Sequence, residues 1–136
     1  MKYMIIQPMN GIPEEKIWEQ REEIRKCVEY WGNEIVDTFF MEEAPENVKT
    51  PGIYYLGRAF MRGLCYADAV ILAPGWDNAR GCKIEREAAR RYGIEAYEYI
   101  REKIEYKGNS DFMKEKYENA PIGVLKVIID GIVEDW

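Results

Sequence analysis

Short apolar runs alternate with helix-length segments along the first hundred residues, and this alternation constrains the fold more than any other feature. The run Asp68–Ala73 is apolar after its first residue, which is typical of a central strand buried on both faces. Segment Glu14–Tyr30 instead repeats apolar residues at helical spacing, with acids in its first turn and Gly32 as a stop signal. By the same criteria we predict strands at 3–6, 34–37 and 95–99, and helices at 51–66 and 82–92.

Strands that are separated by helices imply right-handed crossovers and a parallel sheet. We therefore expect residues 1–100 to form an α/β domain, a three-layer sandwich of the flavodoxin-like or Rossmann-like kind. The whole chain has 136 residues, which fits a single domain. Ligands of such sheets bind beyond the carboxyl ends of the strands. Three loops follow those ends here: Pro8–Gly11, Phe39–Thr50 and Pro74–Gly81.

Residues 101–136 differ in character from the rest of the chain. Glu105–Asn119 is polar and charged, whereas Pro121–Trp136 is rich in apolar residues. Those apolar residues recur at near-helical spacing: Leu125, Ile128, Ile129 and Ile132. We therefore expect a helical C-terminal extension over residues 101–136. Its apolar side either packs on the domain's own flank or forms a contact between the subunits of a homo-oligomer.

The charge balance and the lack of histidine exclude several classes of function. The chain has 19 Lys and Arg against 25 Asp and Glu, so it is a poor candidate for binding a nucleic acid polymer. A small anionic ligand remains open, because a helix N-terminus binds phosphate without net positive charge. With no histidine, Ser-His-Asp and Cys-His catalysis and His-ligated zinc are excluded. Any acid–base or nucleophilic chemistry would therefore be carried out by carboxylates, Tyr, Lys or Cys.

The sequence also predicts where the protein resides. The three cysteines are Cys27, Cys65 and Cys82. They are too far apart in sequence for a metal knuckle, so we expect no metal site and interpret them as thiols in a reducing cytoplasm. The N-terminus lacks a signal-peptide pattern. The longest apolar stretch, Pro121–Val133, contains Lys126 and Asp130 and is too short to span a bilayer. We expect a cytoplasmic protein without membrane contact.

The loop Pro74–Gly81 carries the densest set of candidate ligand groups. Gly81 permits close backbone approach, and free N–H groups of the next turn can hold an anion or a sugar hydroxyl. Trp76 offers a flat face for a nucleobase and Arg80 a planar donor fork. The alternative is a tight connection in which the Trp is only a lid. Further candidates for lining the ligand site are Pro8, Met9, Asn10, Gly11, Gly75 and Asn78.

Glu85 is the main candidate for chemistry. It lies four residues after Gly81, about one helical turn, so it should face the loop and the strand ends, whereas Glu87 lies on a different side. The alternative is a solvated Glu that complements the helix dipole. Asp77 is a weaker candidate. Neither a Walker motif nor G-x-G-x-x-G follows the first strand, so these nucleotide fingerprints give no support.

Four segments of the chain form a recognisable set: Met4–Gly11, Tyr66–Leu72, Pro74–Glu85 and Ala88–Ile94. Together they resemble the nucleoside 2-deoxyribosyltransferase-like superfamily, in particular its phage and bacterial branch with a Pro-Met-x-Gly start and a Pro-Gly-Trp loop. The third segment is the most specific of the four. The resemblance covers about residues 3–99.

The resemblance implies homo-oligomers, a nucleoside or nucleotide pocket at the strand ends, and chemistry without a metal or organic cofactor. In the family a Glu after the glycine loop attacks the anomeric carbon of deoxyribose, and Glu85 matches that position. The implied activity is that of a nucleoside 2-deoxyribosyltransferase or a 2-deoxynucleoside 5-phosphate N-hydrolase, with a glycosyl-enzyme intermediate. Asp77 would donate a proton or hold the sugar, and Trp76 would stack on the base. The sugar or phosphate site would be lined by Asn10, Gly11 and Gly81.

Three positions depart from the family pattern. Active relatives carry a Tyr where Met4 stands and a Gly where Gln7 stands. They also tend to carry an Asp in the helix stretch that here reads Arg58–Met61, which has no acid. These departures favour an alternative on the same fold: a non-catalytic module that sequesters or senses a nucleotide.

Overall fold

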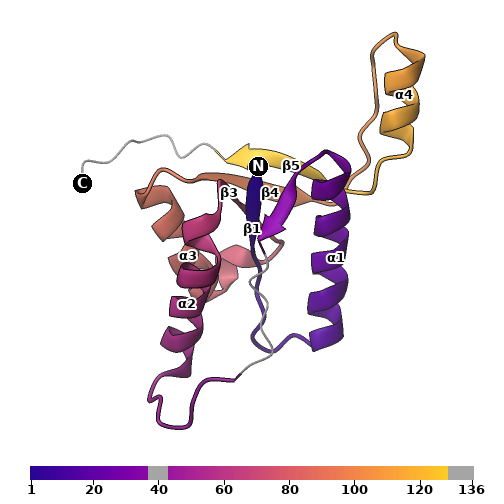
Figure 1. The fold of residues 1–136 in the computed structure, drawn as a ribbon. Coiled ribbons are helices and arrows are strands. Elements are labelled where there is room, and N and C mark those ends of the chain that lie inside the picture. Colours follow the sequence, from indigo (N-terminus) through magenta and orange to yellow (C-terminus); the bar gives the residue numbers. More distant parts are fainter. Residues whose placement is uncertain (37–42, 129–136) are drawn as a thin grey trace.

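The computed structural model describes residues 1–36 and 43–128, and they form an α/β fold (Figure 1). The strands are β1 (Lys2–Ile6), β2 (Glu34–Val36), β3 (Ala69–Leu72), β4 (Glu95–Ile100) and β5 (Val124–Ile128). The α-helices are α1 (Glu14–Tyr30), α2 (Pro51–Arg62), α3 (Arg80–Arg91) and α4 (Asp111–Glu118). Two short 3-10 helices, η1 (Leu64–Tyr66) and η2 (Trp76–Asn78), follow α2 and β3.

The five strands form one sheet in the order β2-β1-β3-β4-β5. The first four are parallel, and β5 runs antiparallel to β4. The chain crosses from β1 through α1 to β2, through α2 to β3 and through α3 to β4, which is why these strands share a direction. The predicted α/β class and mostly parallel sheet are confirmed, and the topology is consistent with a Rossmann-like or flavodoxin-like sandwich.

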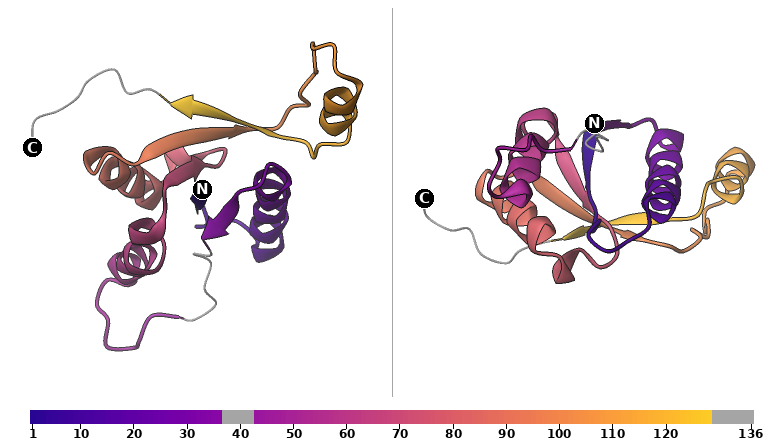
Figure 2. Two further views of the ribbon diagram at one scale, coloured as in Figure 1. Left: turned by 45° about the horizontal axis from the view of Figure 1, so that its top comes forward. Right: turned by 90° about the horizontal axis from the view of Figure 1, so that it is seen from below.

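Alternate residues of β1 contribute to two apolar clusters. Tyr3 and Ile5 pack with Ile24 and Val28 of α1. Met4 and Ile6 belong to the other cluster, which includes Cys82 and Ala89 of α3 and half-buried residues of α2. Helix α1 therefore lies on one side of the strands and α2 and α3 lie on the other (Figures 1 and 2). Strand β3 is buried at every position, as the apolar run beginning at Asp68 predicts.

The C-terminal segment corrects the sequence analysis. Residues Val124–Ile128 are a strand and not the predicted helix, with Leu125 opposite Tyr99 of β4. Leu125 and Ile128 are three residues apart, a helical spacing that places them on opposite faces of a strand, whereas the β-branched Val124, Val127 and Ile128 favour a strand. The pairing decides the outcome, because β4 would otherwise leave its backbone groups unpaired at a sheet edge. The apolar segment thus completes the same sheet as far as Ile128. The rest of the prediction, residues 129–136, lies outside the described residues.

One glycine directs the chain into β5. Gly123 has a φ of +120°, and a Cβ there would run into the ring of Tyr99. Its carbonyl accepts a 3.1 Å hydrogen bond from the thiol of Cys27 in α1.

The only helix described beyond residue 100 is α4, which forms in the polar segment and is capped by Ser110. The predicted loop Phe39–Thr50 has neither helix nor strand over residues 43–50, and its residues 39–42 lie outside the described part.

Candidate functional site

Two of the predicted loops meet at the carboxyl ends of the parallel strands. The backbone pairing of β1 and β3 continues to the end of β1 and one residue past β3, since the N–H of Ala73 donates to the carbonyl of Ile6 at 2.9 Å. Beyond this point a Cβ on Gly75 would lie 3.5 Å from the side chain of Pro8. The loop after β1 and the loop after β3 are therefore in contact, as the parallel sheet requires.

The loop after β3 makes two sharp changes of direction before α3 begins. Gly75 has a φ of +85°, a conformation that favours glycine. The 3-10 helix η2 follows, and α3 starts at Arg80 without a side-chain cap on its first N–H groups. Gly81 is exposed, and a Cβ there would meet no atom within 4 Å. The first turn of α3 thus borders open space, as a ligand-binding helix N-terminus needs.

Glu85 lies one turn into α3 and is half-buried. Burial raises the pKa of Glu85 to about 7, and the positive charge of Arg21 partly opposes this rise. Its neighbour Cys82 is buried, and burial together with the Glu85 charge raises the pKa of this thiol to about 12. Cys82 is therefore a neutral thiol at physiological pH, whereas Glu85 is the group that titrates there.

The positive charge of Arg21 acts on Glu85 from the other side of the sheet. It belongs to α1, whereas Glu85 belongs to α3, so the two charges can approach only beyond the strand ends. Arg21 is 1% exposed, and its Nη1 donates to Oε1 of Gln7 at 3.3 Å. Gln7, directly after β1, is itself held because its Nε2 donates to the Ile17 carbonyl and to Oε1 of Gln20. We call Gln7, Arg21 and Glu85 the edge cluster.

The sequence analysis missed the role of Arg21, although a signal was present. Residues 17, 21, 24 and 28 follow the spacing of the apolar face of α1, and all four are buried. An Arg inside such a row is unusual, because a buried guanidinium needs partners of its own. Gln7, noted only as a departure from the family pattern, is one of those partners.

Trp76 packs half-buried against the apolar cluster that contains Met4 and Ile6. This position agrees with the alternative in which the Trp only covers a tight connection, and it also leaves part of the ring available to a ligand. Four other candidates in the two loops are exposed side chains or backbone at this end of the sheet: Asn10, Asp77, Asn78 and Arg80. Gly11 is exposed as well, with a φ of +77°, while Pro8 and Met9 are half-buried.

The two positions where a Tyr and an Asp were expected serve the core. Met4 is 1% exposed and packs in the same cluster as Cys82. In the stretch Arg58–Met61, Ala59 and Phe60 pack half-buried against that cluster.

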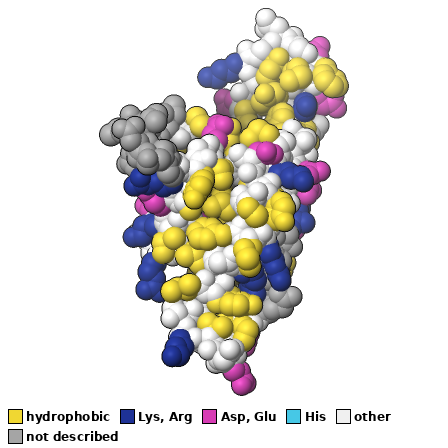
Figure 3. Space-filling model, turned by 60° about the vertical axis from the view of Figure 1, so that its left-hand side comes forward, with side chains coloured by type: hydrophobic (Ala, Val, Ile, Leu, Met, Phe, Trp, Pro, Cys, Tyr) yellow, Lys and Arg dark blue, Asp and Glu magenta, His cyan; other side chains and the backbone are white. Residues whose placement is uncertain are grey.

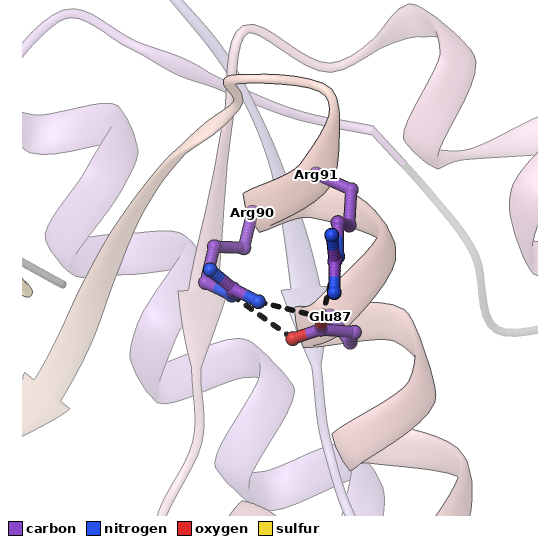
Figure 4. Close-up of polar contacts among 3 residues, drawn as sticks. All are labelled: Glu87, Arg90 and Arg91. Atoms are coloured by element: carbon purple, nitrogen blue, oxygen red, sulfur yellow. Dashed lines mark hydrogen bonds and ion pairs between the residues drawn. The ribbon is translucent and has the colours of Figure 1, made fainter. Parts of the chain in front are cut away.

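Glu87 contrasts with Glu85 on the same helix. Its carboxylate accepts from Arg90 at 2.7 Å and from Arg91 at 2.8 Å (Figure 4). These hydrogen bonds lower the pKa of Glu87 to about 2. The three side chains are at the surface, where such pairs contribute little to stability. As predicted, Glu87 lies on a different side of α3 from Glu85, and it provides a matched control.

A cavity of about 330 Å³ lies at a different place, beside the C-terminal end of α1. Its walls are mainly aromatic and aliphatic, and its lining includes Tyr3, Trp31, Tyr97, Tyr117 and Leu125. Neither candidate loop contributes to it, and the sequence analysis gave no sign of it.

No protein-family model matches the chain, and no curated protein matches it. Within residues 1–36 and 43–128, no three Cys, Asp or Glu side chains are grouped so as to hold a metal ion. None of the helices in this part of the chain has the length and apolar character needed to cross a membrane.

Proposed function

We propose that this protein binds a deoxynucleoside or its phosphate beyond the carboxyl ends of the parallel strands and cleaves or transfers the N-glycosidic bond with Glu85. The observation that carries the proposal is the half-buried Glu85 carboxyl at this edge, whose pKa the charge of Arg21 lowers while desolvation raises it. A carboxyl with a pKa of about 7 that faces a specific counter-charge is a frequent mark of a catalytic site.

The edge cluster fits the requirements of a carboxylate nucleophile. The ionised Glu85 carboxylate would attack the anomeric carbon of the sugar, and the base would leave as the bond to its nitrogen breaks. Water or a second base would then release the sugar from Glu85, as in retaining glycoside hydrolysis. Arg21 supplies the charge that keeps part of the Glu85 population ionised near neutral pH. Gln7 positions Arg21 and would not touch the substrate.

The loops around the cluster offer contacts for the rest of the substrate. The free N–H groups at the start of α3, next to Gly81, would receive a phosphate or a sugar hydroxyl. Asn10 and Gly11 would line the same region from the loop after β1. Asp77 would deliver the proton to the leaving base, since it is exposed one turn before α3.

A second candidate function, nucleotide binding without turnover, is favoured by the same pKa. With a pKa of about 7, roughly half of the Glu85 carboxyls are protonated at neutral pH. A protonated carboxyl is no nucleophile, but it donates a hydrogen bond to a sugar hydroxyl.

Glu85→Gln separates the two functions, because it keeps the shape of the side chain and removes the attacking charge. We expect the wild type to release free base from a deoxynucleoside or deoxynucleotide, measured by chromatography across the common bases. Glu85→Gln should lower this rate by at least about a hundredfold, which is roughly 2.7 kcal/mol of barrier, and leave binding largely intact. As pH rises through about 7, wild-type kcat/KM should rise and level off.

Glu87→Gln is the matched control, since it makes the same change on the outer side of the same helix. It should leave the rate unchanged. Equal turnover in wild type and Glu85→Gln contradicts the nucleophile assignment. Binding with no turnover of any base supports the second function.

Trp76→Ala tests the position of the base. Stacking of a base on an aromatic ring is worth roughly 1–3 kcal/mol, so the variant should bind a nucleotide about ten- to a hundredfold more weakly. A thermal-shift screen with nucleosides and nucleotides is the measurement, because a ligand at 100 times its Kd stabilises the fold by about 2.7 kcal/mol. Unchanged affinity in a folded Trp76→Ala protein would remove Trp76 from the site.

A further inference from the structure

The cavity of about 330 Å³ beside the C-terminal end of α1 has no part in the proposed function. Of the three helices that connect the parallel strands, α2 and α3 cover one side of the sheet and α1 alone covers the other. On the α1 side, Tyr97 of β4 and Leu125 of β5 line the cavity. Segment 101–123, which carries α4, adds another wall and stands beside the end of α1 (Figure 1). We call this cavity the aromatic pocket and the segment the α4 arm.

The aromatic pocket is much larger than an ordinary packing defect. Protein interiors contain few voids larger than a water molecule. An apolar cavity of about 150 Å³ is enough to bind benzene, and pockets for small ligands begin at about 300 Å³. The aromatic pocket, with about 330 Å³, therefore has room for a molecule of one or two fused rings.

Four aromatic rings from different parts of the fold form much of its wall. Tyr3 of β1 and Tyr97 of β4 meet edge to face, with ring centroids 5.6 Å apart and an interplanar angle of 75°. Trp31, directly after α1, and Tyr117 of α4 have centroids 5.0 Å apart at 54°. Rings at such angles leave faces and edges for a further ring, whose edge-to-face or offset contacts add to the gain from apolar burial. The wall therefore favours a planar aromatic ligand over a saturated one.

The pocket is electrically neutral. Among residues 1–36 and 43–128, none that lines it is Asp, Glu, Lys or Arg. Burial raises the pKa of Tyr3 and that of Cys27, and a hydrogen bond with Glu95 raises the pKa of Tyr97 to about 12. These three groups are therefore uncharged at physiological pH. A charged ligand would lose its hydration in the pocket without gaining a counter-charge.

Two charges beside the pocket act against ions of either sign. The Lys116 Nζ lies 5.2 Å from the centroid of the Trp31 ring, so it occupies one face of that ring and repels an organic cation that would bind there. The Glu95 carboxylate, bonded to Tyr97, repels an anion.

Asn33 supplies a directional polar contact in the wall. Its Oδ1 accepts a hydrogen bond from the nitrogen of Met1 at 3.0 Å, so its NH2 group is the part left to meet a ligand. The Cys27 thiol already donates to the carbonyl of Gly123. A ligand with several donors and acceptors, such as a purine, would leave some of them unpaired here.

The α4 arm gives a ligand its way in. None of the residues of α4 is buried, and Figure 3 shows hydrophobic side chains gathered around this helix at the top of the view. The arm is held by the contact of Tyr117 with Trp31 and by the Tyr30 hydroxyl, which donates to the carbonyl of Lys116. A segment with so little buried surface opens at a lower free energy than the sheet.

We propose that the aromatic pocket binds an uncharged planar molecule of one or two fused aromatic rings that carries a hydrogen-bond acceptor for Asn33. This proposal is independent of the proposed function, because no member of the edge cluster lines the pocket.

Titration calorimetry of the full chain with quinoline tests the ligand class. Quinoline is bicyclic, uncharged at neutral pH, and has a ring nitrogen that accepts a hydrogen bond. N-methylquinolinium and quinoline-2-carboxylate carry the same rings with a positive and a negative charge. We expect quinoline to bind at one site per chain and each ion to bind at least about tenfold more weakly. No binding of quinoline at millimolar concentration, or equal binding of either ion, overturns the proposal.

Leu125→Trp tests the location, because its indole would fill the pocket from β5 and should abolish quinoline binding. Lys126→Trp is the matched control: residue 126 is exposed and points to the other side of the same strand, so binding should be unchanged. Circular dichroism confirms the fold of each variant.

Tyr117→Ala removes one wall without altering the sheet, so it gives an answer even where Leu125→Trp does not fold. It should weaken quinoline binding about tenfold. Phe112→Ala, at a 73% exposed position of the same helix, should not weaken it. Unchanged affinity in either folded pocket variant overturns the location.

Asn33→Ala tests the polar contact. It should weaken quinoline binding about two- to tenfold, the net worth of one hydrogen bond, and leave the binding of indole nearly unchanged, since indole has an N–H donor and no acceptor. Equal losses for quinoline and indole would overturn the role of Asn33.

Discussion

Replacement of Arg21 by methionine is expected to destabilise the fold by about 1–3 kcal/mol at pH 8, the usual cost of leaving a buried polar group without its partner. Without the guanidinium, the ionised Glu85 has lost a nearby positive charge, and the side-chain amide oxygen of Gln7 has lost its hydrogen-bond donor. At pH 5 Glu85 is mostly neutral in both proteins, so only the loss of the Gln7 hydrogen bond remains and the difference should be smaller. Urea unfolding of wild type and Arg21→Met at the two pH values measures it.

The neighbouring arginine of α1 supplies a control for this experiment. Arg25 is half-buried and pairs with Glu22 at 3.5 Å on the same helix. Arg25→Met should cost little, and its cost should be equal at pH 5 and pH 8. If Arg21→Met were also equally costly at both values, Glu85 would not be the partner of Arg21.

Glu85→Gln is expected to stabilise the protein at pH 8 by about 3 kcal/mol and to have little effect below pH 4.5. The pKa of Glu85 is raised from 4.5 to about 7 in the folded state, so the folded state binds more protons than the unfolded state between these values. The free energy of unfolding therefore falls as pH rises through this window. Each pKa unit corresponds to about 1.36 kcal/mol. Glutamine resembles the neutral form of Glu85 at every pH, so the free energy of unfolding of the variant does not fall in this window.

The measurement is the difference in unfolding free energy between wild type and Glu85→Gln from pH 4.5 to pH 8. Glu87→Gln is again the control. The pKa of Glu87 is lowered to about 2, so its contribution is complete above the unfolded value of 4.5 and is lost only as pH falls toward 2. The stability difference between wild type and Glu87→Gln should thus be flat over the measured range. A flat difference for Glu85→Gln as well would show that its carboxyl is solvated in the folded protein.

The two expectations have opposite signs at the same site, and both bear on the proposed function. A carboxyl whose ionisation weakens the fold gives no benefit to stability, whereas a pKa near the working pH suits acid–base or nucleophilic chemistry. Functional sites are the places where a fold retains such groups at a cost to stability.

Much of the sheet could be predicted because its signals are local. The apolar run before Ala73 and the helical periodicity of α1 require no knowledge of distant residues. Gly32, with a φ of +86°, ends α1 where the sequence placed the stop. Strand β5 could not be predicted in this way, because the spacing of Leu125 and Ile128 is helical whereas the β-branched residues around them favour a strand. The open edge of β4, contributed by residues about 30 positions earlier, decides between them.

The candidate site was likewise predictable only in part. The sequence by itself determined that Glu85 follows Gly81 by one helical turn and that both come after a buried parallel strand, which was enough to place them beyond the carboxyl ends of the strands. Only the tertiary structure decided that this carboxyl is half-buried and that the charge of Arg21 acts on it. Arg21 and Glu85 are 64 residues apart and lie on helices that cover opposite sides of the sheet. Burial and electrostatic coupling depend on distances in space, and these exist only once β1, β3 and the two helices are packed together.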